Sequence, residues 1–462
     1  MVENAQPRML SKSLSMPEKA AYGAVYFSEA VVAFGINLYL LFFYSSVIKV
    51  GVERVGCALL VGKLWDAVTD PVMGHVSDRT PGRFGRRRPY IVCGGLLLAL
   101  SLILLWAPPP GIGAANGFAY VLVFYILFST FYTVLMIPYA ALGAELTPYY
   151  EERTSLFTWA SALGSAGAVV AALVWRTLVE SHQDDPRRAF TLAGVVCASA
   201  VVLGALITSI GTRERYKASQ VSRGTGVLGL LRASGDALRN RAFMILFVVF
   251  VIAAIGTITV ISMLKFVAQY WLRDNPPFGT IMLVYAVATV MGVPLWGWIA
   301  RVLDKKRAYL ATLAASALCF AGSFAMLRPG ASVAVWCWSA WFGICAAGLL
   351  MLPRAILPDV IDEDELVSGE RREGIYSGMV TFAIKLTAAV GVYLASLGLK
   401  LAGYDTEAVQ QTTRAIATMR VAFGPIPGVF LAICLLIFIM FPITRERANA
   451  TREILKTRRS SS

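Results

Sequence analysis

Two aspartates and a lysine stand close together inside an apolar stretch of the sequence. Lys63, Asp66 and Asp70 fall on one side of a helix, within an arc of about 60° at 100° per residue. Carboxylates four residues apart have Cβ atoms about 5–6 Å from each other, so Asp66 and Asp70 repel unless a cation or a proton lies between them. Oxygen ligands suit Na+, Li+ or a proton better than a soft transition metal. We therefore predict a coupling-cation site at Asp66 and Asp70.

The alternative is a structural salt bridge in which Lys63 neutralises one aspartate. One lysine leaves the second carboxylate unpaired, so the cation site is the better interpretation. Glu29, Lys265 and Lys385 also lie in apolar stretches, and each is a functional candidate because a charge at bilayer depth is costly. The Lys385 ammonium would compete with the cation if the two halves of the chain face each other. For Glu29 and Lys265 a structural role stays equally open.

The composition identifies the solvent in which these charges are costly. Of the 462 residues, 57% are hydrophobic and 15% are charged, against about 25% charged in soluble proteins. A soluble fold cannot bury so much apolar surface, which excludes disordered chains, nucleic-acid binding proteins and ordinary cytosolic enzymes. A bilayer span needs about 20 mostly apolar residues. The composition therefore predicts an all-α integral membrane protein.

Apolar stretches of spanning length recur along the whole chain. Twelve spans are predicted, at 22–48, 54–77, 90–107, 118–146, 154–178, 189–211, 242–271, 278–302, 308–328, 331–353, 375–402 and 422–443. Residues 1–211 form a first six-helix bundle and residues 242–443 a second one. Residues 212–241 are typical of a basic cytoplasmic linker, and 444–462 of a basic cytoplasmic tail. Paired bundles are typical of transporters whose repeats rock against each other.

Basic residues gather in alternate loops. They follow the second and eighth spans and fill the tail, whereas residues 107–117 carry no charge. The positive-inside rule places both termini in the cytoplasm, and the net charge of +14 then reports topology rather than nucleic-acid binding. The first basic loop predicts a cytoplasmic gate, with topology alone as the alternative; its candidate residues are Asp78, Arg79, Arg83 and Arg86. The acidic stretch 357–365 is predicted to be a loop that pairs with the basic loops, or else a solvated helix end.

No catalytic constellation is visible in the sequence. There is no Walker loop, no nucleophile elbow and no metal-ligand spacing among seven cysteines and two histidines. We predict a protein that is not an enzyme and holds no cofactor beyond a coupling Na+, Li+ or H+. A membrane-embedded lipid-modifying enzyme and an uncoupled facilitator stay open, whereas a channel would repeat its buried charges as a ring.

The stretch from Trp65 to Pro71, followed by Gly74, resembles the second helix of the melibiose permease-like glycoside–pentoside–hexuronide:cation symporters of the major facilitator superfamily. Further similar segments cover nearly the whole chain and stand at 39–44, 85–89, 132–139, 355–365 and 371–385. The resemblance implies the major facilitator fold, with twelve transmembrane helices in two pseudo-symmetric six-helix bundles. It also implies a sodium, lithium or proton site.

Site residues follow from this resemblance position by position. Asp66 and Asp70 match the carboxylate ligands of the cation, with Thr69 and Thr133 beside them. Lys385 matches the family's lysine that approaches the site from the C-terminal bundle, and Lys63 matches a basic position just before the motif.

The substrate positions resemble the sugar permeases less. Ala30 with Glu29 beside it, Met136 and Ala140 stand where those permeases have two aspartates and a stacking tryptophan; Tyr139 adjoins them. A site that binds hydroxyl groups loses affinity when its hydrogen-bonding partners are absent. The same aspartate motif occurs in the sodium-dependent lysophosphatidylcholine symporters of animals, and a cavity with Met136 and Ala140 would tolerate an acyl chain better than a sugar.

The sequence thus predicts a monomeric secondary transporter of the plasma (inner) membrane. It would carry a small organic solute with a cation by alternating access. The solute is a sugar or glycoside by family, with a lysophospholipid-like amphiphile as the alternative. Its partners are this substrate, an alkali cation or proton and the lipid bilayer, and no nucleic acid.

Overall fold

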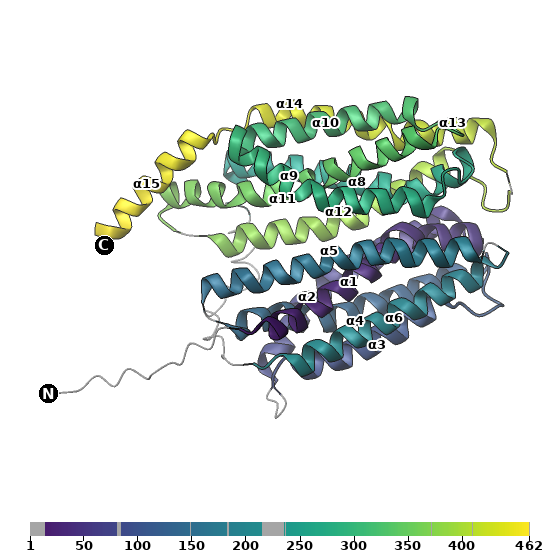
Figure 1. The fold of residues 1–462 in the computed structure, drawn as a ribbon, viewed down its shortest axis with the longest axis horizontal. Coiled ribbons are helices and arrows are strands. Elements are labelled where there is room, and N and C mark those ends of the chain that lie inside the picture. The colour runs from purple at the N-terminus through teal and green to yellow at the C-terminus, as the bar shows by residue number, and fades with distance from the viewer. Residues whose placement is uncertain are drawn as a thin grey trace.

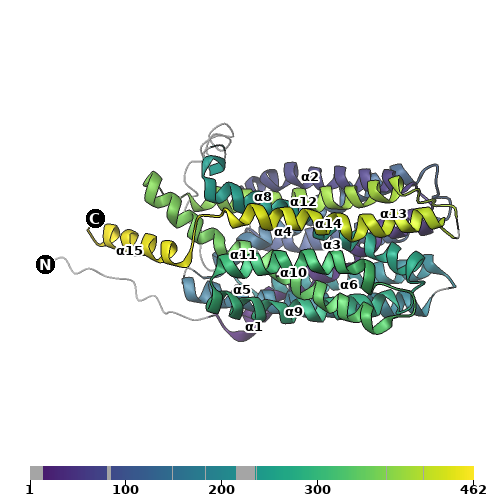
Figure 2. The same cartoon turned by 90° about the horizontal axis from the view of Figure 1, so that it is seen from above.

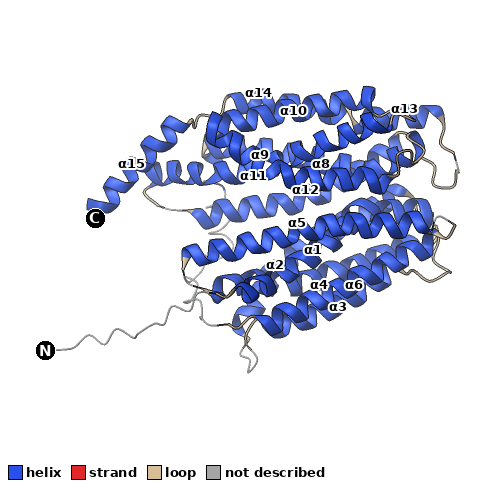
Figure 3. Cartoon of the chain, in the orientation of Figure 1, coloured by secondary structure: helices blue, strands red, loops and turns tan. Residues whose placement is uncertain are grey.

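The computed structural model describes residues 14–80, 85–147, 149–182, 184–214, 235, 237–370, 372–408 and 410–461. Within these ranges the chain is helical, and Figure 3 shows no strand among them. Figure 1 shows the helices side by side in two bundles, one purple to blue and one green to yellow. We call the end that carries helix α15 (Arg445–Ser461) the terminal end, and the opposite end the distal end; both are also visible in Figure 2.

The N-terminal half consists of six long helices and one short π-helical segment. These are α1 Met16–Phe42, η1 Phe43–Val47, α2 Val52–Arg79, α3 Arg88–Trp106, α4 Gly117–Leu146, α5 Tyr150–Ser181 and α6 Pro186–Gly211. The start of α1 is capped by Ser15 and Glu18, which exchange hydrogen bonds in a capping box.

The C-terminal half repeats this plan. Its elements are α8 Arg241–Phe266, η2 Val267–Trp271, α9 Phe278–Leu303, α10 Lys305–Met326, α11 Ser332–Ser368, α12 Glu373–Leu401, α13 Thr413–Phe423 and α14 Pro425–Ile439. The first helix of each half therefore ends in a five-residue π-helix. The predicted linker 212–241 lies mostly outside the described residues, including Gly224-Thr225-Gly226.

Helix packing follows one pattern in both halves. In the first half α1 packs on α5 and α6, α2 on α4, and α3 on α4 and α6; in the second half α8 packs on α12 and α14, α9 on α11, and α10 on α11 and α14. Across the halves α2 packs on α12, α5 on α9, and α1 on α8. The predicted fold of two pseudo-symmetric six-helix bundles is confirmed.

One spanning helix differs from the others in polarity. Among the described residues, eleven helical segments are long and apolar enough to cross a membrane, and α2 is not one of them. Yet α2 has 28 residues and packs against α4 and α12 within the bundle. Its charged residues lower its hydropathy, so the helix that fails the apolar criterion is the one with the predicted cation site.

Two predicted boundaries are wrong. The last span begins at Thr413 rather than at 422, because Arg420 is kept inside the helix between the rings of Trp271 and Phe324, at 3.9 and 4.0 Å. Of the two interpretations of the acidic stretch 357–365, the loop is wrong and the helix end is confirmed, since α11 continues to Ser368 and ends at Gly369 with φ +73°. Hydropathy locates the membrane surface, whereas a helix can continue into water.

The two halves are joined at the distal end. Gly56 of α2 and Gly279 of α9 let the facing helices approach: an added Cβ would lie 1.9 Å from Ser396 Oγ and 2.4 Å from Arg176 Cβ. The Ser46 and Tyr404 hydroxyls lie 2.7 Å apart, and Lys49 donates to the Thr406 carbonyl at 2.6 Å. Burial raises the pKa of the Tyr404 phenol, so its hydroxyl stays protonated and can take part in the hydrogen bond with Ser46.

Candidate functional site

Asp70 lies where three helices from both halves meet. Its Oδ1 accepts a hydrogen bond of 2.9 Å from the Thr133 hydroxyl of α4, and its Oδ2 pairs with the Lys385 ammonium of α12. The Thr69 and Thr133 hydroxyl oxygens lie 3.4 Å apart. The side chains of Asp70 and Lys385 are 19% and 25% exposed, so the ion pair is largely withdrawn from solvent. The structure thus places four predicted site residues together.

Asp66 lies one turn earlier on α2 and is almost completely buried. Its side chain is 2% exposed, and Oδ2 lies 3.7 Å from the Lys63 ammonium. The other carboxylate oxygen, Oδ1, has no hydrogen-bond partner in the described structure, and neither has the buried hydroxyl of Ser129 on α4. Ser129 adjoins Asp66. Because buried polar oxygens are normally paired, these two atoms are available as ligands for a cation.

Glu29 extends the polar cluster into α1. Its Oε1 accepts a hydrogen bond of 3.1 Å from the Tyr132 hydroxyl, and the Lys63 charge acts on it. Lys63 also lies 5.8 Å from the centre of the Tyr132 ring. When ionised, Glu29, Asp66 and Asp70 carry three negative charges against the two positive charges of Lys63 and Lys385. One monovalent cation, or one proton, makes this five-residue cluster neutral.

The predicted substrate residues on α4 have different surroundings. Met136 is partly buried and Ala140 is exposed, and both lie near the face of Thr133 by their spacing. Tyr139 is 1% exposed, stacks on the Tyr22 ring at 4.7 Å and donates to the Tyr22 carbonyl at 2.8 Å. Tyr139 therefore packs α4 against α1, and the structure does not bring it into the charged cluster.

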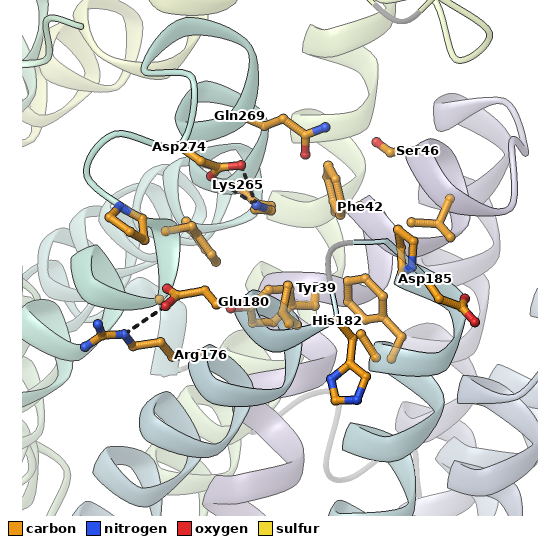
Figure 4. Close-up of a pocket in the computed structure, with 18 of the residues that line it drawn as sticks. Tyr39, Phe42, Ser46, Arg176, Glu180, His182, Asp185, Lys265, Gln269 and Asp274 are labelled. Atoms are coloured by element: carbon orange, nitrogen blue, oxygen red, sulfur yellow. Dashed lines mark hydrogen bonds and ion pairs between the residues drawn. The ribbon is translucent and has the colours of Figure 1, made fainter. Parts of the chain in front are cut away.

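Lys265 lies apart from the cluster, at the distal end. Its ammonium is 5.3 Å from the ring centres of both Phe42 and Phe278 and 3.2 Å from Asp274. All four residues, together with Arg176 and Glu180, line a cavity of about 780 Å³. Figure 4 shows Lys265, Phe42 and Asp274 on one side of it and Arg176 with Glu180 on another. The prediction that groups Lys265 with the coupling residues is thus not matched by its position: it joins the two halves where they close.

The predicted gate residues stand at the terminal end. Arg86 and Arg87 pair with Glu145 of α4, whose side chain is 3% exposed, and Arg87 also donates to the Ser77 hydroxyl at 2.6 Å. Arg79 ends α2 and is exposed. Arg83 and the side chain of Asp78 lie outside the described residues.

The acidic end of α11 forms the corresponding cluster of the second half. Asp359 accepts from Lys305 of the second basic loop at 2.6 Å and pairs with Arg452 of α15. Glu363 pairs with Arg447 of the same helix. The basic tail is therefore a helix, α15, that packs on α11.

Sequence reasoning missed Ser129, Tyr132, Glu145 and Arg354 as site residues. Ser129 and Thr133, four residues apart in an apolar helix, form a polar stripe that the sequence shows. Glu145 is a single acid at a helix end opposite a basic loop. The exposed Arg354 of α11 acts on Tyr26, one turn from Glu29. It was hidden because it directly follows the predicted span 331–353.

Comparison with known proteins agrees with this geometry. The family described as MFS/sugar transport protein matches residues 21–445. An uncharacterized symporter of Synechocystis is 26% identical, covering 98% of both chains. The sodium-dependent lysophosphatidylcholine symporter 1 of Gallus gallus is 27% identical over 99% of this chain and 92% of its own length. The inner membrane symporter YicJ of Escherichia coli is 27% identical over 97% and 95%.

Solved structures share the fold. The nucleoside transporter NupG superposes with a TM-score of 0.68 at 12% identity, covering 92% of this chain and 99% of that one. A bacterial homolog of the lysosomal transporter Spinster, in an inward-facing and unoccupied conformation, gives a TM-score of 0.63 at 14% identity over 95% and 96%.

Proposed function

The chain belongs to the MFS/sugar transport protein family, and from this premise we propose that it is a symporter that binds its coupling cation between Asp66 and Asp70. It is a multi-pass membrane transporter whose two halves rock about a central site. The ligands are the two aspartates with Thr69 and Thr133. When the cation binds, the contact between Lys385 and Asp70 changes, so the C-terminal half responds to the bound cation.

The contact of Asp70 with both halves carries this proposal. Thr133 holds one carboxylate oxygen from α4 of the same half, and Lys385 holds the other from α12 of the opposite half. A cation that binds Asp70 competes with the Lys385 ammonium, because both need the same lone pairs. Cation binding therefore changes a contact between the two halves, which is what coupling requires.

The substrate is a small organic solute that enters beside this cluster. Met136 and Ala140 favour an amphiphile with an acyl chain over a sugar, because the methionine sulfur is only a weak hydrogen-bond acceptor and the alanine methyl group offers none. Relatives named for lysophosphatidylcholine support the amphiphile, whereas the family description supports a sugar or glycoside. Glu29, which the Tyr132 hydroxyl holds beside the cluster, supplies a charged group for the polar part of either substrate.

The membrane orientation and the working unit complete the proposal. The basic terminal end faces the cytoplasm and the distal end faces the outside, in the plasma or inner membrane. The distal contacts then close the outer side in this conformation. The cluster is built from one chain, so a monomer is sufficient for transport.

Thermal unfolding of the purified protein in Na+, in Li+ and across pH tests the cation site. A ligand that binds only the folded state stabilises it by about 2.7 kcal/mol at a hundredfold excess over Kd. We expect Na+ or Li+ to raise Tm in the wild type and in the surface control Glu407→Gln, but not in Asp70→Asn.

The other outcomes separate the alternatives. A Tm that ignores alkali cations but follows pH, and loses this dependence in Asp70→Asn, indicates proton coupling. A Tm that depends on neither ion rejects symport and leaves an uncoupled facilitator or a lipid-modifying enzyme. Uptake into liposomes of a sugar panel and a lysophospholipid panel, driven by the cation so identified, then decides the substrate.

A further inference from the structure

A cavity of about 440 Å³ lies at the terminal end of the C-terminal half. It is bordered by the end of α9, the start of α10, α11, residues 441–444 and α15. Five basic and two acidic residues line it: Arg301, Lys305, Lys306, Arg445, Arg452, Asp304 and Asp359. This surplus of positive charge beside the predicted membrane surface is unrelated to the central cation cluster.

The same end of the N-terminal half is built from matching parts. Arg87 and Lys305 pair with Glu145 and Asp359 near the ends of α4 and α11. The next residue, Arg88 or Lys306, donates to the carbonyl of Ser209 or Phe441. Three residues after each of these carbonyls the chain repeats a short sequence, Thr212-Arg213-Glu214 in the first half and Thr444-Arg445-Glu446 in the second.

The glutamate of this repeat is used differently in the two halves. The Glu214 carboxylate accepts from the backbone N–H groups of Arg86, Arg87 and Arg88, at 2.6, 2.7 and 3.2 Å. It therefore binds the N-terminus of α3, where backbone donors and the helix dipole favour an anion. Glu446, in contrast, lies exposed in the first turn of α15 and does not line the cavity.

The start of α10 has groups that can bind an anion, but Glu446, which corresponds to Glu214, does not line the cavity there. Its N-cap residue Asp304 makes no capping hydrogen bond with its side chain and has φ +95°. Arg301 and Arg445 are exposed, and within the described part of the chain each guanidinium, with its five donors, makes one 3.3 Å hydrogen bond to a backbone carbonyl. Asp304 and the first residues of α10, Lys305 and Lys306, thus line a cavity from which Glu446, the counterpart of Glu214, is absent.

Exposed apolar side chains beside the cavity indicate that the anion belongs to a lipid. Val302, Leu303, Ile439 and Met440 are 57%, 48%, 54% and 59% exposed at the adjoining ends of α9 and α14. Apolar side chains exposed at this depth suit the acyl chains of the bilayer, while the basic cavity suits a phosphate. We propose that this cavity binds the phosphate headgroup of an anionic membrane phospholipid in the place that corresponds to the Glu214 carboxylate.

The bound headgroup connects the α9–α10 loop to the start of α15. Arg301 lies at the end of α9 and Arg445 at the start of α15, so one phosphate between them fixes the angle at which α15 leaves the bundle. Because α15 also contacts α11 through Arg447 and Arg452, the lipid stabilises the terminal end of the whole half.

The test uses the full chain in nanodiscs of phosphatidylcholine, with and without phosphatidylglycerol. Thermal unfolding gives the stabilisation by phosphatidylglycerol, and native mass spectrometry counts the lipids that stay bound. We expect the Arg301→Gln/Arg445→Gln variant to bind phosphatidylglycerol more weakly by about fivefold per arginine. The matched control Arg54→Gln/Arg414→Gln removes two exposed arginines at the distal end and should keep the wild-type response.

Three results would overturn the proposal. The first is a full phosphatidylglycerol response in the Arg301→Gln/Arg445→Gln variant, provided that this variant retains its wild-type response to the coupling cation. The second is equal stabilisation by inorganic phosphate in pure phosphatidylcholine, which would make the ligand a soluble anion. The third is a clearly stronger phosphatidylglycerol response in Glu446→Gln, because removal of a carboxylate that occupies the cavity in the wild type would free the site for the lipid.

Discussion

Helices α2 and α9 occupy corresponding places in the two halves, yet only α2 carries the charged cluster. Both helices keep a glycine, a proline and a second glycine at the same spacing: Gly56, Pro71 and Gly74 in α2, and Gly279, Pro294 and Gly297 in α9. In this register Lys63, Asp66 and Asp70 correspond to Ala286, Thr289 and Val293. The two helices thus share the glycines and the proline that shape the backbone, but the charged residues at these positions are found in α2 and not in α9.

In the proposed mechanism, the helix plan shared by the two halves allows the rocking motion, and the charges carried by only one half couple this motion to a cation. Matching glycines allow α2–α12 and α5–α9 to approach in the same way, which lets the halves rock about a common axis. In this proposed mechanism, a charge cluster in one half, completed by Lys385 of the other, makes that motion depend on a cation. Two identical clusters would not need a contact across the halves.

The largest expected effect on cation affinity comes from Asp66, which belongs to the half that carries the charged cluster. In Asp66→Asn the buried carboxylate becomes an amide, and Lys63 loses its partner. Because a charged hydrogen bond contributes about 1.5–3 kcal/mol, we expect affinity for the coupling cation to fall by roughly 10- to 100-fold. Titration calorimetry of the purified protein with NaCl and LiCl measures this change.

The control lies at the corresponding position of α9. Thr289 donates only to the Tyr285 carbonyl of its own helix, at 2.8 Å, so Thr289→Val should leave cation affinity unchanged. If both variants lose affinity equally, the response reflects general damage to the bundle and the assignment of the site to α2 is wrong.

A second prediction compares the clusters at the terminal end. Glu145→Gln removes the buried carboxylate that pairs with both Arg86 and the 5% exposed Arg87, and we expect a loss of about 1.5–3 kcal/mol in unfolding free energy, as for a hydrogen bond to a charged group. Asp359→Asn should cost about 1 kcal/mol or less, because Lys305 and Arg452 are 34% and 45% exposed and can turn into water. Thermal unfolding in one membrane mimetic measures both. A larger loss in Asp359→Asn would contradict the difference in burial.

Much of the fold follows from the sequence alone. Twelve apolar stretches predict the twelve spans, since each needs a continuous run of residues that the bilayer accepts. The errors occur at Arg420 and at 357–365, where aromatic contacts or water let a helix continue through polar residues. A hydropathy profile does not detect these contacts, because it scores each residue without its neighbours in space.

The candidate site is predictable to the extent that its residues share one helix. Lys63, Asp66 and Asp70 are found from spacing on α2, and Lys385 is found as a charge in an apolar stretch. Thr133 follows only from the family resemblance, because contacts between distant helices leave no local pattern. Tyr139 shows the reverse case. It is adjacent in sequence to the substrate positions, but its ring points into the packing of α1 on α4.

The third prediction removes the contribution of the second half. In Lys385→Met the competing ammonium leaves Asp70, so we expect the coupling cation to bind about tenfold more tightly, a gain of about 1.4 kcal/mol. The two side chains keep 25% and 19% of their surface exposed, and this residual contact with solvent limits the gain. The measurement is the rise in Tm per tenfold increase in cation concentration; weaker binding in this variant would show that Lys385 holds the site together rather than competing for it.

The smallest effect is expected at Tyr139, which separates packing residues of α4 from site residues. Tyr139→Phe removes one hydrogen bond, that to the Tyr22 carbonyl, and keeps the stacked ring. Because the Tyr22 carbonyl lies inside helix α1 and also accepts a backbone hydrogen bond there, it is not left unpaired, and the cost in unfolding free energy should be about 1 kcal/mol. Its neighbour on the cluster side, Thr133→Val, should instead weaken cation binding, since its hydroxyl donates directly to Asp70. If Tyr139→Phe changes cation affinity as much as Thr133→Val does, the packing of α4 and the cation site are not separable.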